Sequence, residues 1–183
     1  MTLEEFLAWE DRQEFKHEFD GYRPVAMAGG TLAHAVIQRN LAIAVGGRLL
    51  GKPCDFVGSD FKIEVAGSVR YPDGMVYCTP VPPDAKLILD PVVIFEILSP
   101  STATKDQFVK GPEYEATPSV RRYVMLAQNR VAATVFSREN GEWIGRSFSE
   151  GATLAMPEIG ITVPLAELYA GLDLSQVPDE EDA

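Results

Sequence analysis

A carboxylate stands where the sequence predicts a buried strand. Residues 92–99 form a near-continuous apolar run that contains Glu96 and is closed by Pro100. Such a run is typical of a central strand that is covered on both faces of its sheet. An isolated ionised carboxylate in that place would cost several kcal/mol. We therefore expect Glu96 to be protonated, paired with a cation or bound to a metal ion.

A second acid, Asp73, lies in a segment with strand-like alternation, residues 69–78. If that strand is continuous, the neighbours of Asp73 on its own face are apolar or aromatic. An equally weighted interpretation places Asp73 in a turn between Pro72 and Gly74, where it faces water. The loop that follows residue 78 is long enough to bring Asp73 and Glu96 together.

Two adjacent carboxylates repel each other unless they share a proton or a cation. Oxygen ligands with open coordination positions suit Mg²⁺ or Mn²⁺ rather than zinc. Such an ion can activate water and stabilise charge on a phosphoryl oxygen. The pair Asp73 and Glu96 therefore indicates a metal site with hydrolytic chemistry.

Three further residues have a functional and an ordinary interpretation. Lys110 follows the Glu96 strand and could activate water or balance charge, although a surface pair with Asp106 is favoured by spacing alone. Glu18 could reach a site at the end of the sheet, or it could be a solvated strand residue. His34 could also belong to a site, but a lone histidine is more often a packing or surface residue.

The bulk properties limit the classes of function. The net charge of −11 argues against broad, nonspecific binding of nucleic acid, which depends on Lys and Arg. It does not exclude a nuclease, because a metal ion or a local basic patch can supply positive charge. Cys54 and Cys78 match no zinc spacing, and we expect buried free thiols. No apolar run approaches the length of a membrane span and the N-terminus has no signal peptide, so we expect a cytoplasmic protein without membrane contact.

The hydrophobic pattern predicts an α/β fold, with a central mixed β-sheet flanked by helices and additional antiparallel strands. The expected helices are 2–11, 32–50, a third from residue 101 or 102 to 115, and a short turn at 165–169. The expected strands are a hairpin around Asp20-Gly21, then 54–58, 61–65, 69–78, 92–99, 120–126, 131–138, 142–148 and 159–163, with a surface loop at 79–91. We expect one domain over residues 1–174 and an acidic, disordered tail over 175–183.

Five segments follow one another along the chain: Glu18-Phe19-Asp20-Gly21, His34 at the start of a long helix, Tyr71-Pro72-Asp73, the run from Phe95 to Thr102, and Asp106, Lys110 and Tyr114 on the next helix. In this order they resemble the Uma-type family of restriction endonuclease-like proteins, within the PD-(D/E)xK nuclease superfamily. The resemblance extends over about residues 2–138.

The resemblance implies a restriction endonuclease-like core and a divalent metal held by Asp73, Glu96 and the main-chain carbonyl of Ile97. The superfamily usually has a lysine two residues after the glutamate, where this chain has Leu98. In this family a lysine of the following helix is thought to replace it, which corresponds to Lys110, and Glu18 matches the family's early acid. Pro112 departs from a regular helix and predicts a kink beside Lys110.

Two functions follow from these observations. The first is a Mg²⁺- or Mn²⁺-dependent endonuclease that hydrolyses phosphodiester bonds in DNA, with Glu18, Asp73, Glu96 and Lys110 as catalytic residues. The second is a noncatalytic, dimeric binding or assembly protein on the same fold, which the acidic composition favours. Superfamily nucleases often pair to reach both strands, so the first function also implies a homodimer.

Overall fold

The central element of the fold is a six-stranded mixed sheet. The computed structural model describes residues 1–27, 29–98 and 106–175. The strand order is β11-β10-β9-β8-β6-β3, with β8 parallel to β9 and the other neighbours antiparallel. The strands are β3 (Asp55–Gly58), β6 (Gly74–Tyr77), β8 (Pro91–Leu98), β9 (Arg122–Ala127), β10 (Ala132–Glu139) and β11 (Glu142–Ser149). The predicted mixed sheet is thus confirmed, and β8 lies inside it as the apolar run indicated.

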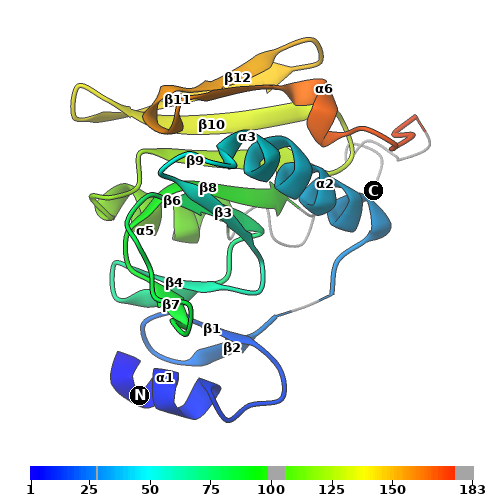
Figure 1. Ribbon diagram of the computed structural model, residues 1–183. Coiled ribbons are helices and arrows are strands. Elements are labelled where there is room, and N and C mark those ends of the chain that lie inside the picture. The colour runs from blue at the N-terminus through cyan, green and yellow to red at the C-terminus, as the bar shows by residue number, and fades with distance from the viewer. Residues whose placement is uncertain (28, 99–105, 176–183) are drawn as a thin grey trace.

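One face of this sheet is covered by the long helix predicted from residue 32 (Figure 1). It comprises α2 (Leu32–Leu41), a π-helical turn η1 (Ala42–Gly46) and α3 (Gly47–Leu49). Its apolar stripe, including Ile37, Leu41 and Val45, packs against the odd-numbered residues of β8. The same core includes the C-terminal elements β12 (Thr153–Met156), the 3-10 turn η3 (Pro157–Ile159), β13 (Ile161–Pro164) and α6 (Leu165–Leu168).

The other face packs against a second, five-stranded sheet of order β2-β1-β5-β4-β7, which lies below the main sheet in Figure 1. Its strands are β1 (His17–Phe19), β2 (Pro24–Ala26), β4 (Lys62–Val65), β5 (Ser68–Arg70) and β7 (Leu87–Ile88). The helix α1 (Leu3–Glu10) closes its lower end, with Phe6 packed on Phe19. The hairpin β1–β2 and the edge position of Pro24 are as predicted, whereas β7 lies inside the expected loop.

A π-helical segment, η2 (Asp106–Lys110), continues into α5 (Gly111–Ala116) and contacts the lower face of the main sheet through Tyr114. Pro112 falls in the first turn of α5, where a residue without a backbone N–H costs little. The helix departs from regular α-helical geometry in the π-helical turn η2 before Pro112, next to the position where Pro112 predicted a kink. Residues 101–105 and the predicted tail beyond residue 175 lie outside the described part of the chain.

The expected continuous strand 69–78 is wrong. It breaks at Tyr71-Pro72-Asp73 into β5 and β6, which belong to different sheets. Pro72 has no N–H to give to a ladder and restricts the backbone of the residue before it. The shared face that alternation predicted for Asp73 therefore does not exist, and Asp73 lies at the start of β6 instead.

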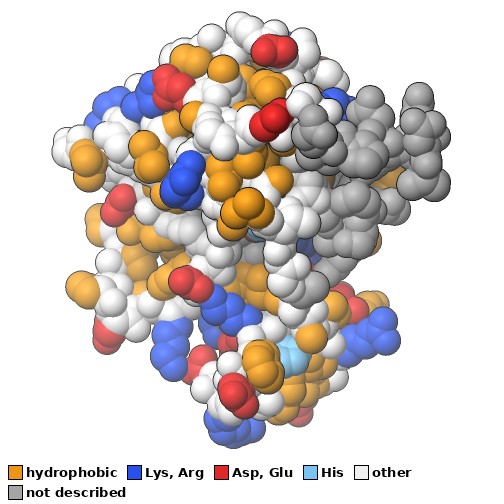
Figure 2. Space-filling view, turned by 90° about the vertical axis from the view of Figure 1, so that its right-hand side faces the viewer, with side chains coloured by type: hydrophobic (Ala, Val, Ile, Leu, Met, Phe, Trp, Pro, Cys, Tyr) orange, Lys and Arg blue, Asp and Glu red, His pale blue; other side chains and the backbone are white. Residues whose placement is uncertain are grey.

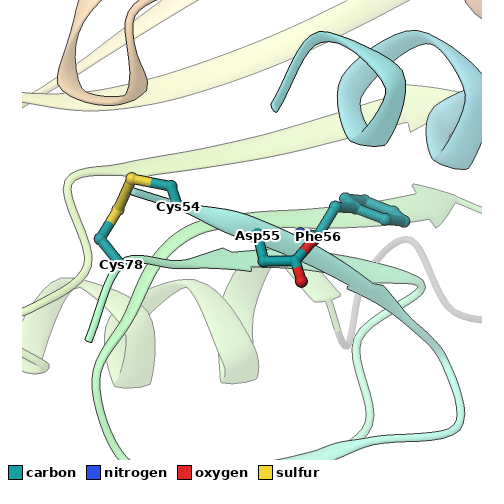
Figure 3. Close-up of a disulfide and its surroundings, with 4 residues drawn as sticks. All are labelled: Cys54, Asp55, Phe56 and Cys78. Carbon is teal, nitrogen blue, oxygen red and sulfur yellow. Dashed lines mark hydrogen bonds between the residues drawn. A yellow bond between two sulfur atoms is a disulfide. The ribbon is translucent and has the colours of Figure 1, made fainter. Parts of the chain in front are cut away.

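The expected free thiols are also wrong, because Cys54 and Cys78 form a disulfide (Figure 3). Cys54 precedes β3 and Cys78 follows β6. The antiparallel register pairs Asp55 with Tyr77, so the two cysteines come opposite each other with their Cα atoms 4.0 Å apart. This register depends on the pairing of distant segments in the sheet, and the spacing of the cysteines in the sequence does not predict it.

Candidate active site

Asp73 is fixed to the strand that carries Glu96. The β6–β8 ladder begins with Gly74 opposite Phe95, and the Asp73 side chain extends it by one hydrogen bond. The N–H of Ile97 donates to Asp73 Oδ2 at 2.7 Å. At Gly74, beside it, a Cβ would lie 2.7 Å from the ring of Phe56, so a larger residue there would have to displace that ring. The Pro-Asp-Gly step thus presents the carboxylate at the end of β6 and excludes the interpretation of Asp73 as a fully solvated turn residue.

Two side chains of α2 approach the same carboxylate from the helix-covered face. His34 Nε2 lies 3.1 Å from Asp73 Oδ1. Gln38, one turn later, donates from Nε2 to the main-chain oxygen of Asp73 at 3.3 Å and to Oδ1 at 3.5 Å. Both oxygens of the carboxylate therefore have defined partners. Spacing of four residues on one helix face places His34 and Gln38 together.

Glu96 points to the opposite face of the main sheet from its neighbours Phe95 and Ile97, which belong to the core under α2. It is 4% exposed. Its Oε1 accepts hydrogen bonds from Lys110 Nζ and from the Tyr114 hydroxyl, each at 2.8 Å. Burial and the charge of Glu96 raise the pKa of Tyr114 well above its ordinary value, so this hydroxyl remains a donor. Glu96 is therefore a paired carboxylate, one of the three states that the sequence allowed.

Glu18, on β1, completes this buried group. Its Oε1 lies 3.2 Å from Lys110 Nζ, so the Lys110 ammonium bridges Glu18 and Glu96. All three side chains are at least nine-tenths buried. Lys110 and Glu18 are thus buried, so the surface position favoured for Lys110 and the solvated position considered for Glu18 are both wrong.

Arg70 contacts Glu18 through the carboxylate oxygen that does not face Lys110. It is fully buried, contacts Glu18 Oε2 at 3.5 Å, and binds both oxygens of Glu113 at 2.6 and 2.7 Å. Ser68 also donates to Glu113. Burial alone would lower the pKa of Arg70, but Glu113 and Glu18 together with Tyr114 more than offset it, so the pKa is raised and the guanidinium stays charged. This pairing anchors α5, and with it Lys110 and Tyr114, to the second sheet.

The predicted residues therefore lie in two connected parts. Glu18, Glu96 and Lys110 share direct contacts on one face of β8, while Asp73 joins the site through the N–H of Ile97, one residue after Glu96. Sequence reasoning did not find Gln38, Arg70 or Glu113, and it named Tyr114 only within the family resemblance, without a role. The available signal for Gln38 was its spacing of four residues from His34, and for Tyr114 its spacing of four residues from Lys110.

The donor chemistry of the predicted metal ligands fits a hard divalent cation. In an extended strand the N–H and C=O of one residue point to the same neighbour, so the Ile97 carbonyl is on the Asp73 side of β8. Two carboxylates and a carbonyl are oxygen ligands of the kind that Mg²⁺ and Mn²⁺ prefer. Within the described ranges, no three or more His, Cys, Asp or Glu side chains gather as a metal-binding group, so the predicted set depends on the main-chain oxygen.

The mixed sheet, the flanking helices and the buried cluster of acids and lysine define a restriction endonuclease-like protein. A model of the Uma2 family, described as "putative restriction endonuclease", matches residues 3–166, and the chain belongs to this family. The family match supports a nuclease-like function.

Two known proteins are similar over nearly the whole chain. An uncharacterized protein of Synechocystis sp., slr1290, is 31% identical over 176 residues, which cover 94% of this chain and 93% of that protein. A crystal structure of "a putative nuclease belonging to DUF820" from Anabaena variabilis matches with a TM-score of 0.78. At 16% identity, covering 93% of this chain and 98% of that one, it establishes the shared fold.

Proposed function

We propose that this protein is a metal-dependent endonuclease that hydrolyses phosphodiester bonds in DNA. Asp73, Glu96 and the Ile97 carbonyl would hold Mg²⁺ or Mn²⁺. When bound, that ion supplies Lewis acidity and a water of lowered pKa. The single observation that carries the proposal is the buried ammonium of Lys110 between Glu18 and Glu96, beside the strand end to which Asp73 is fixed.

Each side chain has a role in this proposal. Lys110 balances the charge of the two glutamates and is available to stabilise negative charge on a phosphoryl oxygen. Glu18 holds the ammonium in place, and Tyr114 orients Glu96 by donating to Oε1. The pairing of Arg70 with Glu113 keeps α5 at the distance that lets both donors reach Glu96.

Cleavage of supercoiled plasmid tests this function. We expect nicking with Mg²⁺ or Mn²⁺ by the native protein, and its loss in Asp73→Ala and Glu96→Ala. Glu10→Gln is the matched control, because Glu10 is also a buried acid paired with a lysine, Lys62, but it lies outside the site. Unchanged nicking in both site variants would reject this site. Turnover of small phosphodiesters without nicking would instead assign a different substrate class.

A noncatalytic binding or assembly protein is the second candidate. The net charge of −11 favours it. On the face shown in Figure 2, Lys and Arg side chains are interspersed with Asp and Glu instead of forming one basic patch. Absence of cleavage together with absence of a thermal shift on adding Mn²⁺ is the result that this candidate predicts.

The proposal includes a cytoplasmic homodimer. Pairing would let two sites reach both DNA strands, and the long helix exposes the apolar side chains of Leu32 and Ile43. Among the described residues, no helix is both long enough and apolar enough to cross a bilayer. Light scattering during size-exclusion chromatography measures the oligomeric state directly.

A further inference from the structure

We propose that His34 is a positioning residue that fixes the Asp73 carboxylate for binding a divalent cation, and that Gly30 leaves the space in which the His34 ring lies. This inference rests on the proposed function, because it concerns the same metal site. Neither residue is among the expected ligands. The argument depends on how the start of α2 is held, how the imidazole is packed and what remains available on Asp73.

The start of α2 is fastened at the end of β9. Thr31 is the N-cap residue, and its Oγ1 accepts a hydrogen bond from the His34 N–H at 3.2 Å. The Thr31 hydroxyl in turn donates to Gln128 Oε1 at 2.7 Å. Gln128 is buried just after β9, so its position is set by the main sheet. The backbone of His34 is therefore positioned relative to the sheet by Thr31 and Gln128, independently of the contacts of its side chain.

Gly30 packs directly against the imidazole of His34. A Cβ at Gly30 would lie 3.1 Å from both Cγ and Nδ1 of the ring, closer than ordinary van der Waals contact. Gly29, by contrast, has open space around the position of a Cβ. Glycine at position 30 thus lets the ring lie close to the backbone, with Nε2 directed at Asp73.

These contacts leave Asp73 oriented and still able to bind an ion. Its Oδ2 accepts from the Ile97 N–H, and its Oδ1 faces His34 Nε2 and Gln38 Nε2. Each carboxylate oxygen has about two acceptor positions, so Oδ2, which has one partner, retains capacity for a cation. Partners that orient a ligating side chain typically contribute about 10–100-fold to metal affinity.

Isothermal titration with Mn²⁺ measures this contribution without any nuclease assay. We expect His34→Leu to weaken Mn²⁺ binding by about 10–100-fold. His34→Gln should recover most of the affinity, because its amide can place a donor near the position of Nε2. Gly30→Ala should weaken binding in the same direction, although it removes no polar group, whereas Gly29→Ala should bind as the native protein does. Thermal unfolding in EDTA, run on every variant, identifies any that does not fold.

The outcomes separate this inference from the function on which it rests. If Asp73→Ala abolishes Mn²⁺ binding while His34→Leu and Gly30→Ala bind as the native protein does, the positioning role is overturned and the metal site stands. If His34→Gln binds as weakly as His34→Leu, the donor at Nε2 is not what matters, and the inference is equally overturned. If the native protein binds no Mn²⁺, the metal site and the positioning role both fall. Should His34→Leu fail to fold, Gly30→Ala against Gly29→Ala decides the question.

Discussion

Replacing Lys110 by methionine tests the electrostatics of the site most severely. Lys110 Nζ lies 2.8 Å from Glu96 Oε1 and 3.2 Å from Glu18 Oε1. At these distances and an effective dielectric of about 20, each contact corresponds to about 5–6 kcal/mol of gross attraction, which the desolvation of the ammonium partly offsets. Methionine has similar length but no charge, so it leaves two buried carboxylates without this cation.

We therefore expect Lys110→Met to lower the free energy of unfolding by about 3–5 kcal/mol in EDTA at pH 7. For a chain of this size that loss corresponds to a melting temperature lower by ~6–20 °C. Urea denaturation followed by circular dichroism gives the free energy. Added Mn²⁺ should stabilise Lys110→Met by more than it stabilises the native protein, because the ion supplies positive charge to carboxylates that have lost their cation.

Lys62→Met is the matched control. Lys62 is equally buried and contacts Glu10 at 2.7 Å and Asp11 at 3.3 Å, in a cluster outside the proposed metal site. It should lose comparable stability in EDTA but gain no more from Mn²⁺ than the native protein does. A loss below about 1 kcal/mol in Lys110→Met, the size of an exposed ion pair, would refute the reasoning. Equal recovery of both variants by Mn²⁺ would refute the assignment of the metal to this site.

Two further predictions concern stability away from the site. Burial raises the pKa of Tyr169 above its ordinary value of 10.0. The stability from this group is therefore complete below about pH 10 and falls by about 1.4 kcal/mol per pH unit above it, as the unfolded chain ionises first. Tyr169→Phe removes the donor to the Ala127 and Ala132 carbonyls and should lower the free energy of unfolding by about 1 kcal/mol at pH 7. Urea denaturation at pH 7 and pH 11 should show a smaller loss of stability at alkaline pH in this variant than in the native protein. An equal alkaline loss in both proteins would contradict the prediction. The double variant Cys54→Ser and Cys78→Ser should lose about 3 kcal/mol of free energy of unfolding, because the disulfide closes a loop with a separation of 24 residues. Dithiothreitol should destabilise the native protein but not the variant. Equal sensitivity of both proteins to dithiothreitol would contradict the stabilising role of the disulfide.

Most of the helices and strands could be predicted because they depend on local patterns, although β7 and β12 were not. The apolar run around Glu96 indicated β8, and the stripe from residue 32 indicated the long helix. The need of Glu96 for a partner could also be predicted, since a buried carboxylate among apolar residues has few stable states. The structure supplies Lys110 and Tyr114 for that purpose.

The remaining features depend on pairings between distant segments. The break at Pro72 sends residues 68–70 and 74–77 into different sheets, although their alternation suggested one strand. The Cys54–Cys78 disulfide follows from the β3–β6 register, and the approach of His34 to Asp73 follows from the position of α2 over the sheet. None of these is a property of nearby residues. Tertiary packing decides them, and a single sequence does not display it.

The most direct test of the metal site is a crystal of the native protein soaked in Mn²⁺, with anomalous scattering to locate the ion. The proposed function predicts one strong anomalous peak in contact with the Asp73 carboxylate, the Glu96 carboxylate and the Ile97 carbonyl oxygen. A peak elsewhere, or no peak between Asp73 and Glu96 at saturating Mn²⁺, would contradict it.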